Sequence, residues 1–477
     1  SLSLSLSLTL TLFLTHSLTH SLSASPASPA SPASPPPPHP PFLSLFPLAG
    51  STSTFLASFD AITGNPDPVE VVSEKIVHMG LAPTHIRMDD GTRVVYMVDA
   101  SGGAHVFPSS PAAKAFYAAN IAPISFYYLV ETDEARVTGY QLPAKTADAG
   151  SPASAALWTV QFSGETVETF AAPPADEIVQ SPVRILPDRS VMYKYLNPNL
   201  LVLATSARAG DEDSSAGGIL DDDVVNIYTI DSVTGRVLSR TRHNNARGPV
   251  YAVCSENWVV YHYWSLERKG RWELGVIELY EGAESILSAE KVVDVIRGAT
   301  EKEAFSSYTA KNPSVSRQTM IFPHAVRSMK VTQTRYGVTL RNVLMALGSD
   351  QVYSLDKRFA DPRAPVNKQL TMEDREEGVI PYQAVIPVPP NRLLTYNQTI
   401  VGLRFMETAP ARLESVCHVF AIGLDIFYTR TSPSRSFDLL AEDFDYLVLL
   451  LMIGALAGLT TLAWWKTKQK DLNSAWR

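Results

Sequence analysis

Short stretches rich in β-branched and aromatic residues recur along the chain from about Phe55, and turn residues separate them. These strand-like stretches are residues 93–98, 124–130, 157–162, 191–195, 224–230, 258–264, 274–280, 343–355 and 416–430. The last two are long enough to hold two strands each. Helical periodicity is best in residues 286–296. Many short strands joined by turns predict a sandwich, a barrel or a propeller.

An internal repeat favours the propeller. The motif Asp60-Ala61-Ile62-Thr63-Gly64 recurs at 231–235 as Asp231-Ser232-Val233-Thr234-Gly235, and a weaker relative begins at Asp99. In such a motif the Asp side chain can bond the following amides and the Gly supplies a positive φ, which is typical of a hairpin turn. The spacing of the two copies fits four units of about 43 residues, the length of a four-stranded blade. We therefore predict an all-β fold, a β-propeller with incomplete blades.

The first 55 residues differ in composition from the rest. Residues 1–8 alternate Ser and Leu, and residues 25–41 are Ala/Ser/Pro repeats. Proline runs lack amide donors and favour an extended conformation. The stretch before the prolines has no Lys or Arg, unlike the start of a signal peptide. We expect a disordered segment or a translation artefact, with a degraded targeting segment as the alternative. Because the chain opens at Ser1, we also expect a fragment or a mispredicted gene start.

Residues 446–465 predict a transmembrane helix. They form a run of 20 residues without a charge, and at about 1.5 Å per residue such a run spans a bilayer core of about 30 Å. Tyr446 at one end and Trp464 and Trp465 at the other suit the two interfaces. Acidic residues precede the span and basic residues follow it, so the positive-inside rule places residues 466–477 in the cytosol and the upstream chain outside it. A buried core helix is the alternative.

Several residues of this membrane region are candidates for contacts. Gly454, Gly458 and Thr461 form a small-residue stripe that would let another helix approach closely. Lys466 and Lys468 would anchor the cytosolic end among lipid headgroups.

Two charged residues lie on the other side of the span, in the juxtamembrane segment 433–445. Asp445 adjoins the span and Arg435 lies ten residues upstream. Asp445 either marks the non-cytosolic side only, or pairs with Arg435 or with a basic residue of a neighbouring chain.

Composition and motifs argue against several functions. The 40 Lys and Arg residues against 48 Asp and Glu give a net charge of −8, unlike a nucleic-acid-binding protein. No nucleophile elbow, P-loop, HExxH or dinucleotide fingerprint occurs. The histidines show no metal-ligand spacing, and the acidic stretch 211–223 fails the EF-hand template, with Ala216 and Asp222 at the sixth and twelfth positions. We therefore expect no catalytic, cofactor or metal site.

Two features depend on a luminal location. Asn397-Gln398-Thr399 is a glycosylation sequon, so we expect a glycan on Asn397. Cys254 and Cys417 could pair in an oxidising lumen, but the sequence gives no geometry for a bond, and we expect the thiols to stay free.

Several stretches resemble one family in order along the chain. They are DRSVMYKYLNPNLL (188–201), GPV (248–250), SENWVVY (255–261), LYEG (279–282), IPY (380–382), YNQT (396–399), GLDI (423–426) and NSAWR (473–477). Together they resemble the family of subunit 1 of the endoplasmic reticulum membrane protein complex, strongly from residue 183 and plausibly back to 55. Members of that family are about twice as long, so the chain looks like its C-terminal half.

The resemblance implies a function. It implies a luminal propeller of quinoprotein-like type over residues 56–432, one membrane helix, and a scaffold role in a complex that inserts tail-anchored and multipass membrane proteins. The partners implied are the other subunits, client membrane proteins and the lipid bilayer, with no nucleic acid. The alternatives are a single-pass receptor or adaptor ectodomain and a quinone-dependent dehydrogenase. The dehydrogenase usually has an adjacent-cysteine disulfide, which this sequence lacks.

Overall fold

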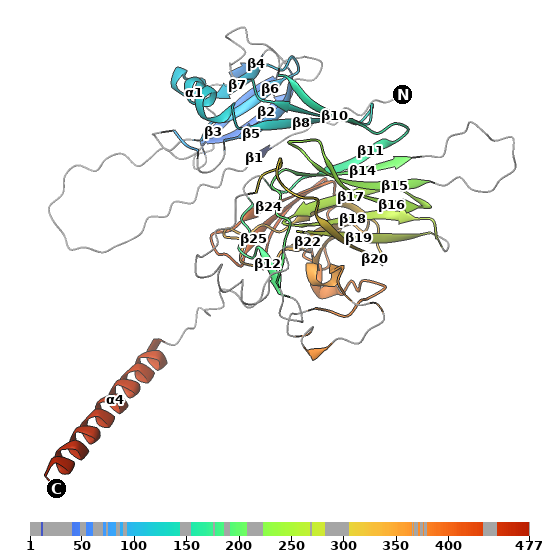
Figure 1. The fold of residues 1–477 in the computed structure, drawn as a ribbon. Coiled ribbons are helices and arrows are strands. Elements are labelled where there is room, and N and C mark those ends of the chain that lie inside the picture. Colours follow the sequence, from blue (N-terminus) through green and yellow to red (C-terminus); the bar gives the residue numbers. More distant parts are fainter. Residues whose placement is uncertain are drawn as a thin grey trace.

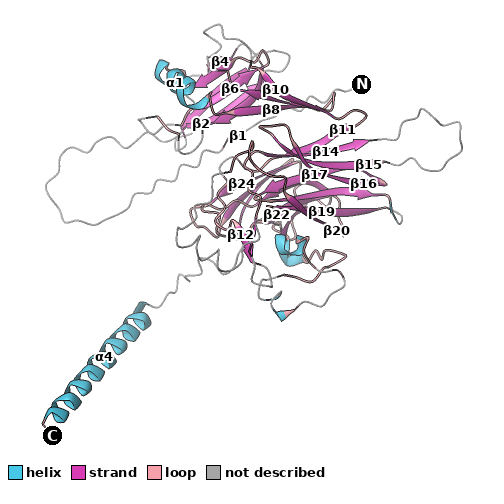
Figure 2. Cartoon of the chain, in the orientation of Figure 1, coloured by secondary structure: helices cyan, strands magenta, loops and turns pink. Residues whose placement is uncertain are grey.

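The structure is a computed structural model of the chain. It describes residues 11–12, 41–47, 54–60, 70–72, 75–82, 86–88, 93–143, 154–174, 177–185, 191–207, 223–267, 270–281, 305–364, 366, 371–372, 375, 379–432 and 446–476. Strands dominate these residues, and the long helix at the C-terminal end stands apart from them (Figure 2). The predicted helical stretch 286–296, most of the acidic stretch 211–223, and Arg435 and Asp445 lie outside the described residues.

The first three sheets contain strands β1–β10 (Figure 1). The first has the order β1 (Thr11–Leu12), β2 (Pro41–Pro47), β3 (Thr54–Asp60) and β4 (Glu70–Val72). The second contains β5 (Ile76–Leu81), β6 (Val95–Asp99) and β7 (Ala104–Phe107). The third contains β8 (Phe126–Glu131), β9 (Arg136–Gln141) and β10 (Ala156–Gln161). Strand β2 therefore lies within the stretch 1–55 that we expected outside the fold.

Four further sheets follow in chain order. The fourth has the order β11 (Thr166–Ala171), β14 (Leu200–Ala207), β15 (Val224–Asp231) and β16 (Val237–Asn244). The fifth contains β17 (Ala246–Ser255), β18 (Trp258–Ser265), β19 (Arg271–Tyr280) and β20 (Ser314–Ile321). The sixth contains β21 (Val326–Val331), β22 (Asn342–Leu347) and β23 (Val352–Asp356). The seventh contains β24 (Phe405–Pro410), β25 (Cys417–Ile422) and β26 (Ile426–Thr431).

The remaining elements are short, apart from the last helix. A two-stranded hairpin, β12 (Val183–Ile185) and β13 (Val191–Tyr193), is inserted between β11 and β14. The helix α1 (Pro111–Phe116) continues into a π-helical turn, η1 (Tyr117–Ile121). Two 3-10 turns, η6 (Lys357–Ala360) and η7 (Pro390–Arg392), follow β23, and α4 (Tyr446–Ala475) closes the chain.

Successive sheets pack face to face, as propeller blades do. Separate buried clusters join the second sheet to the third, the third to the fourth, the fourth to the fifth, the fifth to the sixth, and the sixth to the seventh. Strand β18 shows the alternation that this packing requires. Trp258 and Val260 face the cluster shared with the sixth sheet, whereas Val259, Tyr261 and Tyr263 face the cluster shared with the fourth. The propeller prediction is confirmed.

The repeated motif forms the hairpin turn that its chemistry predicts. Asp231 ends β15, and its Oδ1 accepts hydrogen bonds from the amides of Val233 and Thr234, both at 3.0 Å. Gly235 follows at φ +71°. Asp99 ends β6 in the same way, and its Oδ1 accepts from the amide of Gly103 at 2.8 Å. A buried Asp at the end of a strand therefore organises both turns.

The predicted spacing of four blades is wrong. Asp60 ends β3 in the first sheet and Asp231 ends β15 in the fourth, so the two positions are three sheets apart. The fourth sheet is longer than an average blade because it spans residues 166–244 and includes the inserted β12–β13 hairpin. The residues that follow Asp60 lie outside the described part, so the matching turn is not described.

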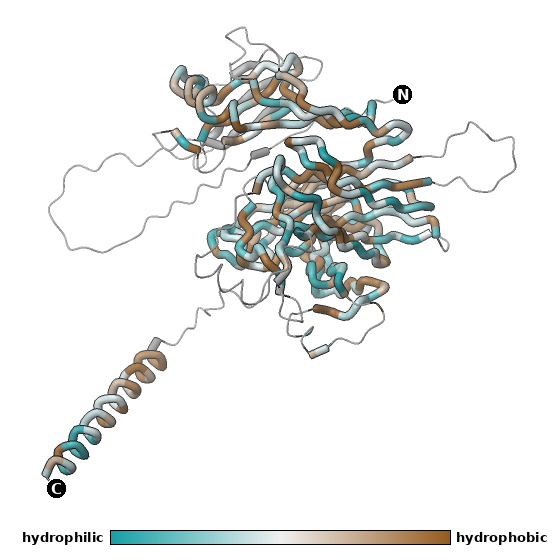
Figure 3. Tube along the Cα trace, viewed as in Figure 1, coloured by the Kyte–Doolittle hydropathy of each residue, from teal (hydrophilic) through white to brown (hydrophobic). Residues whose placement is uncertain are grey.

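The helix α4 begins at Tyr446 as predicted and continues beyond the predicted span. It has 30 residues, which corresponds to about 45 Å, and its hydropathy falls towards the C-terminal end (Figure 3). It is long and apolar enough to cross a membrane, and none of its apolar window is buried inside the structure. Residues 466–475 of the predicted tail therefore continue the same helix.

Buried histidines make the propeller sensitive to acid. His262 is fully buried, stacks on Trp272 with ring centroids 4.8 Å apart, and places its Nε2 3.2 Å from the carbonyl oxygen of His324. Burial lowers the pKa of His262 from 6.5 to about 4. Burial also lowers the pKa values of His78 and His243 to about 4.

We predict that the free energy of unfolding falls as the pH falls from 6.5 to 4. In this window the unfolded chain binds protons that folded His262 excludes, so its contribution to stability is lost, by about 2 kcal/mol at pH 5. His262→Phe keeps a ring against Trp272 but cannot titrate. Denaturant titrations at pH 7 and pH 5 should show a smaller pH difference for this variant than for the unaltered chain. Equal pH differences would contradict the prediction.

Candidate functional site

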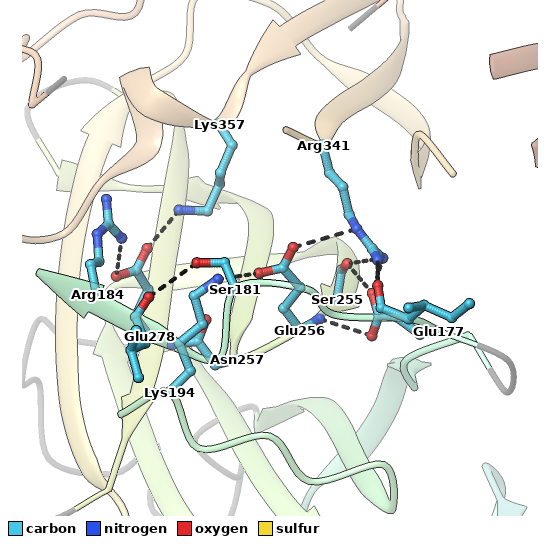
Figure 4. A network of polar contacts seen from close by, with 12 residues as sticks. Glu177, Ser181, Arg184, Lys194, Ser255, Glu256, Asn257, Glu278, Arg341 and Lys357 are labelled. Atoms are coloured by element: carbon cyan, nitrogen blue, oxygen red, sulfur yellow. Dashed lines mark hydrogen bonds and ion pairs between the residues drawn. The ribbon is translucent and has the colours of Figure 1, made fainter. Parts of the chain in front are cut away.

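A charged network, rather than a pocket, is the most developed polar feature of the structure. Among the described residues, no group of three or more His, Cys, Asp or Glu side chains is placed to hold a metal ion. The network is centred on the segment that leaves β11 and returns at β14. We call residues 177–185 and 191–194 of this segment the strap. Figure 4 shows strap side chains converging on side chains of the fifth and sixth sheets.

The first half of the network surrounds Arg341, which directly precedes β22. Its side chain is only 4% exposed and pairs with the carboxylate of Glu177 in the strap. The guanidinium also donates to the Ser255 hydroxyl at 2.9 Å and to the Ile178 carbonyl at 2.9 Å. One buried cation therefore joins the strap, the end of β17 and the start of β22 (Figure 4).

Glu256 extends this half along the strap. Its carboxylate accepts from Lys194 Nζ at 2.6 Å and lies 3.5 Å from Arg341 Nε. Its amide donates to the Glu177 carboxylate at 2.9 Å. Glu256 occupies the tight turn between β17 and β18 with φ +51°. In this turn its amide faces Glu177 while its carboxylate faces Lys194.

The second half surrounds Glu278 on β19. This carboxylate is 2% exposed and accepts from Lys357 Nζ at 2.8 Å, while Arg184 Nη1 of the strap lies 3.3 Å away. Burial would raise the pKa of Glu278, but Lys357 and Arg184 together outweigh burial and hold the pKa below its usual range. Tyr280 also donates its hydroxyl to Glu278.

Arg184 extends the second half to a further carboxylate. Its Nη2 donates to Asp361 Oδ2 at 2.6 Å, and Asp361 lies in the segment after β23. Burial would raise the pKa of Asp361, but Arg184 and Arg363 hold it below its usual range. Arg184 therefore pairs with one carboxylate on β19 and with another from the segment after β23.

These ion pairs fix the position of the strap more than they add to the free energy of unfolding. The desolvation of two ions can cancel their attraction, whereas the loss of one partner leaves an unpaired buried charge. The strap therefore has one favourable position across the fifth and sixth sheets.

Sequence reasoning did not identify this network. The pair of Arg341 and Glu177 is separated by 164 residues, and that of Arg184 and Asp361 by 177. The residues lie in several different elements, such as Arg184 in β12 and Glu278 in β19, and no local motif marks them. A hint was present only in the stretches quoted for the family resemblance, which contain Lys194 and Glu256.

The structure places the predicted site residues apart from this network. Asn397 is exposed in a turn after η7. Lys466 and Lys468 are exposed on α4, and Lys468 Nζ lies 4.9 Å from the centroid of the Trp464 ring.

The stripe of Gly454, Gly458 and Thr461 is also exposed on α4. A Cβ added at either glycine would meet nothing within 4 Å. The Thr461 hydroxyl donates to the Gly458 carbonyl at 2.8 Å, so its polar group is satisfied within the helix.

The two cysteines lie in different parts of the core. Cys254 is buried in the cluster between the fourth and fifth sheets, and Cys417 begins β25. Both are free thiols in the structure.

We predict that Arg341→Ala destabilises the propeller by about 3–5 kcal/mol, because the buried Glu177 carboxylate loses its cation, whereas Glu256 keeps Lys194. The matched control is Arg358→Ala. That arginine also pairs with a carboxylate, Asp356, but its side chain is 50% exposed, so the loss should stay below about 1 kcal/mol. Denaturant titration measures both. Equal losses for the two variants would contradict a specific role of the strap network.

Comparisons with known proteins agree with this architecture. A family model described as "ER membrane protein complex subunit 1, second beta-propeller" matches residues 40–434. The chain is 34% identical over 429 residues to the Gallus gallus protein "ER membrane protein complex subunit 1". The aligned residues make up 89% of this chain and 40% of that protein.

Proteins of the same name from two other organisms are also similar. The Xenopus laevis protein is 37% identical over 356 residues, covering 74% of this chain and 33% of that protein. The Schizosaccharomyces pombe protein is 31% identical over 351 residues, covering 73% of this chain and 36% of that protein. The chain thus spans 33–40% of the length of these three relatives. From the propeller match and these identities, the chain belongs to the family of ER membrane protein complex subunit 1.

Proposed function

We propose that the chain is a non-catalytic, membrane-anchored scaffold subunit of the ER membrane protein complex. In this role it supports the insertion and folding of tail-anchored and multipass membrane proteins. The observation that carries the proposal is the strap network, in which buried ion pairs fix one surface across two blades. A scaffold must present such a surface in one position to its partners. The one apolar helix supports attachment of that surface to a membrane.

The proposed orientation places the propeller in the lumen and the end of α4 in the cytosol. The basic residues Lys466, Lys468 and Lys470 follow the apolar part of the helix, and the positive-inside rule favours the cytosol for them. Lys468 also lies over the ring of Trp464, an arrangement suited to the headgroup region, where an aromatic ring and a cation are both stable.

The proposed partners are the other subunits of the complex, client membrane proteins and the bilayer. Another helix could approach α4 along Gly454, Gly458 and Thr461, because no side chain of the described structure fills the space beside the glycines. At the luminal boundary we propose that Asp445 pairs with Arg435 or with a basic residue of a neighbouring subunit.

We predict that the full-length protein co-purifies with other membrane subunits after extraction in a mild detergent. Its depletion should lower insertion of a tail-anchored reporter, and re-expression should restore insertion. A reporter that inserts by another route is the control and should not change. Purification of the protein alone, with insertion unaffected by its depletion, would contradict the scaffold function.

We also predict that Asn397 carries an N-linked glycan. The asparagine is exposed in a turn, so the sequon is accessible if the propeller is luminal. Endoglycosidase should lower the apparent mass of the protein, and Asn397→Gln should abolish this shift.

Protease added to intact microsomes should leave the propeller protected, which tests the topology independently. Digestion of the propeller without detergent would mean that the orientation is wrong.

A further inference from the structure

The strap lies at the end of the sheets where β22 begins, and we call this the strap end of the propeller. It carries several exposed apolar side chains. Three segments provide them: the strap at Ile178, the β21–β22 connection at Tyr336, Val338 and Leu340, and the β24–β25 turn at Leu413. Their exposed fractions are 46%, 47%, 48%, 60% and 59%, respectively. We call these five residues the apolar patch. Exposed apolar side chains that gather in this way mark an interaction surface.

Glu414 holds two of these segments together. Its side chain is buried, and its carboxylate accepts from the amides of Tyr336 at 2.6 Å, Val338 at 2.8 Å and Thr339 at 3.2 Å. These bonds hold the backbone of the β21–β22 connection against Glu414, while the side chains of Tyr336, Val338 and Leu340 are exposed. The Glu414 carboxylate therefore ties the β24–β25 turn to the β21–β22 connection and is itself buried.

The strap joins the third segment to the patch. Arg341 donates to the Ile178 carbonyl at 2.9 Å, and the backbone of Gly337 lies against the same residue. A Cβ on Gly337 would lie 1.9 Å from the Ile178 carbonyl oxygen, and the glycine has φ +67°. Only glycine fits this contact. The buried strap network therefore also sets the position of the apolar patch.

The chain leaves the propeller for its membrane helix next to this patch. Thr431, the last residue of β26, pairs with Cys417, which follows the Leu413–Glu414 turn in the same sheet. Residues 432–445, 14 positions, separate Thr431 from the start of α4. Fully extended, such a segment reaches at most about 50 Å. A propeller tethered in this way cannot leave the neighbourhood of the bilayer.

The charges beside the patch fit a phospholipid surface. Arg335 places its guanidinium 5.1 Å from the centroid of the Tyr336 ring, and the exposed Arg412 precedes Leu413. Arginine, tyrosine and aliphatic side chains together match the headgroup region, where cations contact phosphates and apolar groups enter the acyl boundary. Since Glu414 is buried, it adds no exposed negative charge to oppose such contacts.

We infer that the apolar patch rests on the bilayer surface beside α4, with Val338, Leu340 and Leu413 at the level of the headgroups. This contact would give the propeller a second attachment to the membrane besides the helix and would limit its tilt. The inference rests on the proposed membrane anchoring by α4, but it does not depend on which clients the complex inserts.

The test measures the depth of single labelled positions. The full-length protein carrying Val338→Cys is labelled with an environment-sensitive fluorophore in nanodiscs of phosphatidylcholine and phosphatidylinositol. Nitroxide lipids report contact with the bilayer, and iodide reports contact with water. Burial raises the pKa of Cys254 far above its usual range and that of Cys417 to about 11, so the native thiols should react slowly.

Leu424→Cys is the matched control. Leu424 is 85% exposed in the β25–β26 turn, at the end of β25 opposite the patch. We expect nitroxide lipids to quench the label at position 338 at least threefold more than the label at 424, and iodide to show the reverse order. Leu340→Cys should repeat the result at 338 and guards against a local effect of one label.

Two results would overturn the inference. Equal, weak quenching by nitroxide lipids with full access to iodide at 338, 340 and 424 would place the patch in water. Protection of 338 and 340 from both quenchers would show that a protein covers the patch. Co-purification with the complex and protease protection of the propeller would be unchanged in either case, so failure of this inference remains separate from failure of the proposed function.

Discussion

Pairing of buried carboxylates is the constraint on which the strap end of the propeller depends. Glu278 and Glu177 are almost removed from solvent, and each would be costly without a cation. The cations come from distant positions: Arg184 from the strap, Lys357 from just after β23 and Arg341 from just before β22. The strap, the fifth sheet and the sixth sheet are therefore ordered together, because displacement of any one removes a partner from a buried charge.

The sequence was sufficient to predict whatever depends on neighbouring residues. Strand β18 alternates between two cores, and its period is visible in the residues from Trp258 to Tyr263. The turn after Asp231 follows from the local chemistry of Asp and Gly. The membrane helix follows from the length of one uncharged run. In each case the physical cause lies within about ten residues along the chain.

Features that depend on distant residues could not be predicted in the same way. The partners of Arg341 come from the strap and from the turn at Ser255, and no local pattern marks any of them. The blade spacing between Asp60 and Asp231 was miscounted because an inserted hairpin looks like ordinary strand sequence. The apolar patch was also missed, since Tyr336, Val338 and Leu340 alternate like a strand, whereas the amides of Tyr336, Val338 and Thr339 bind Glu414 instead of a partner strand.

Both ends of the sheets carry exposed apolar side chains, including Leu424 and Ile426 at the far end, so the patch is distinguished by the exit of the chain towards α4 and by the arginines beside it. The patch and the exit at Thr431 lie at the strap end. Asn397 lies towards the other end, where the neighbouring Ile400 donates its amide to the Asp350 carbonyl in the β22–β23 turn. Strand β22 has six residues and separates these ends by about 20 Å. One surface of the propeller cannot both carry a bulky, hydrated glycan and make an apolar contact with lipid. A glycan on Asn397 and a patch on the bilayer would therefore require opposite ends of the sheets, and the two positions themselves lie at opposite ends.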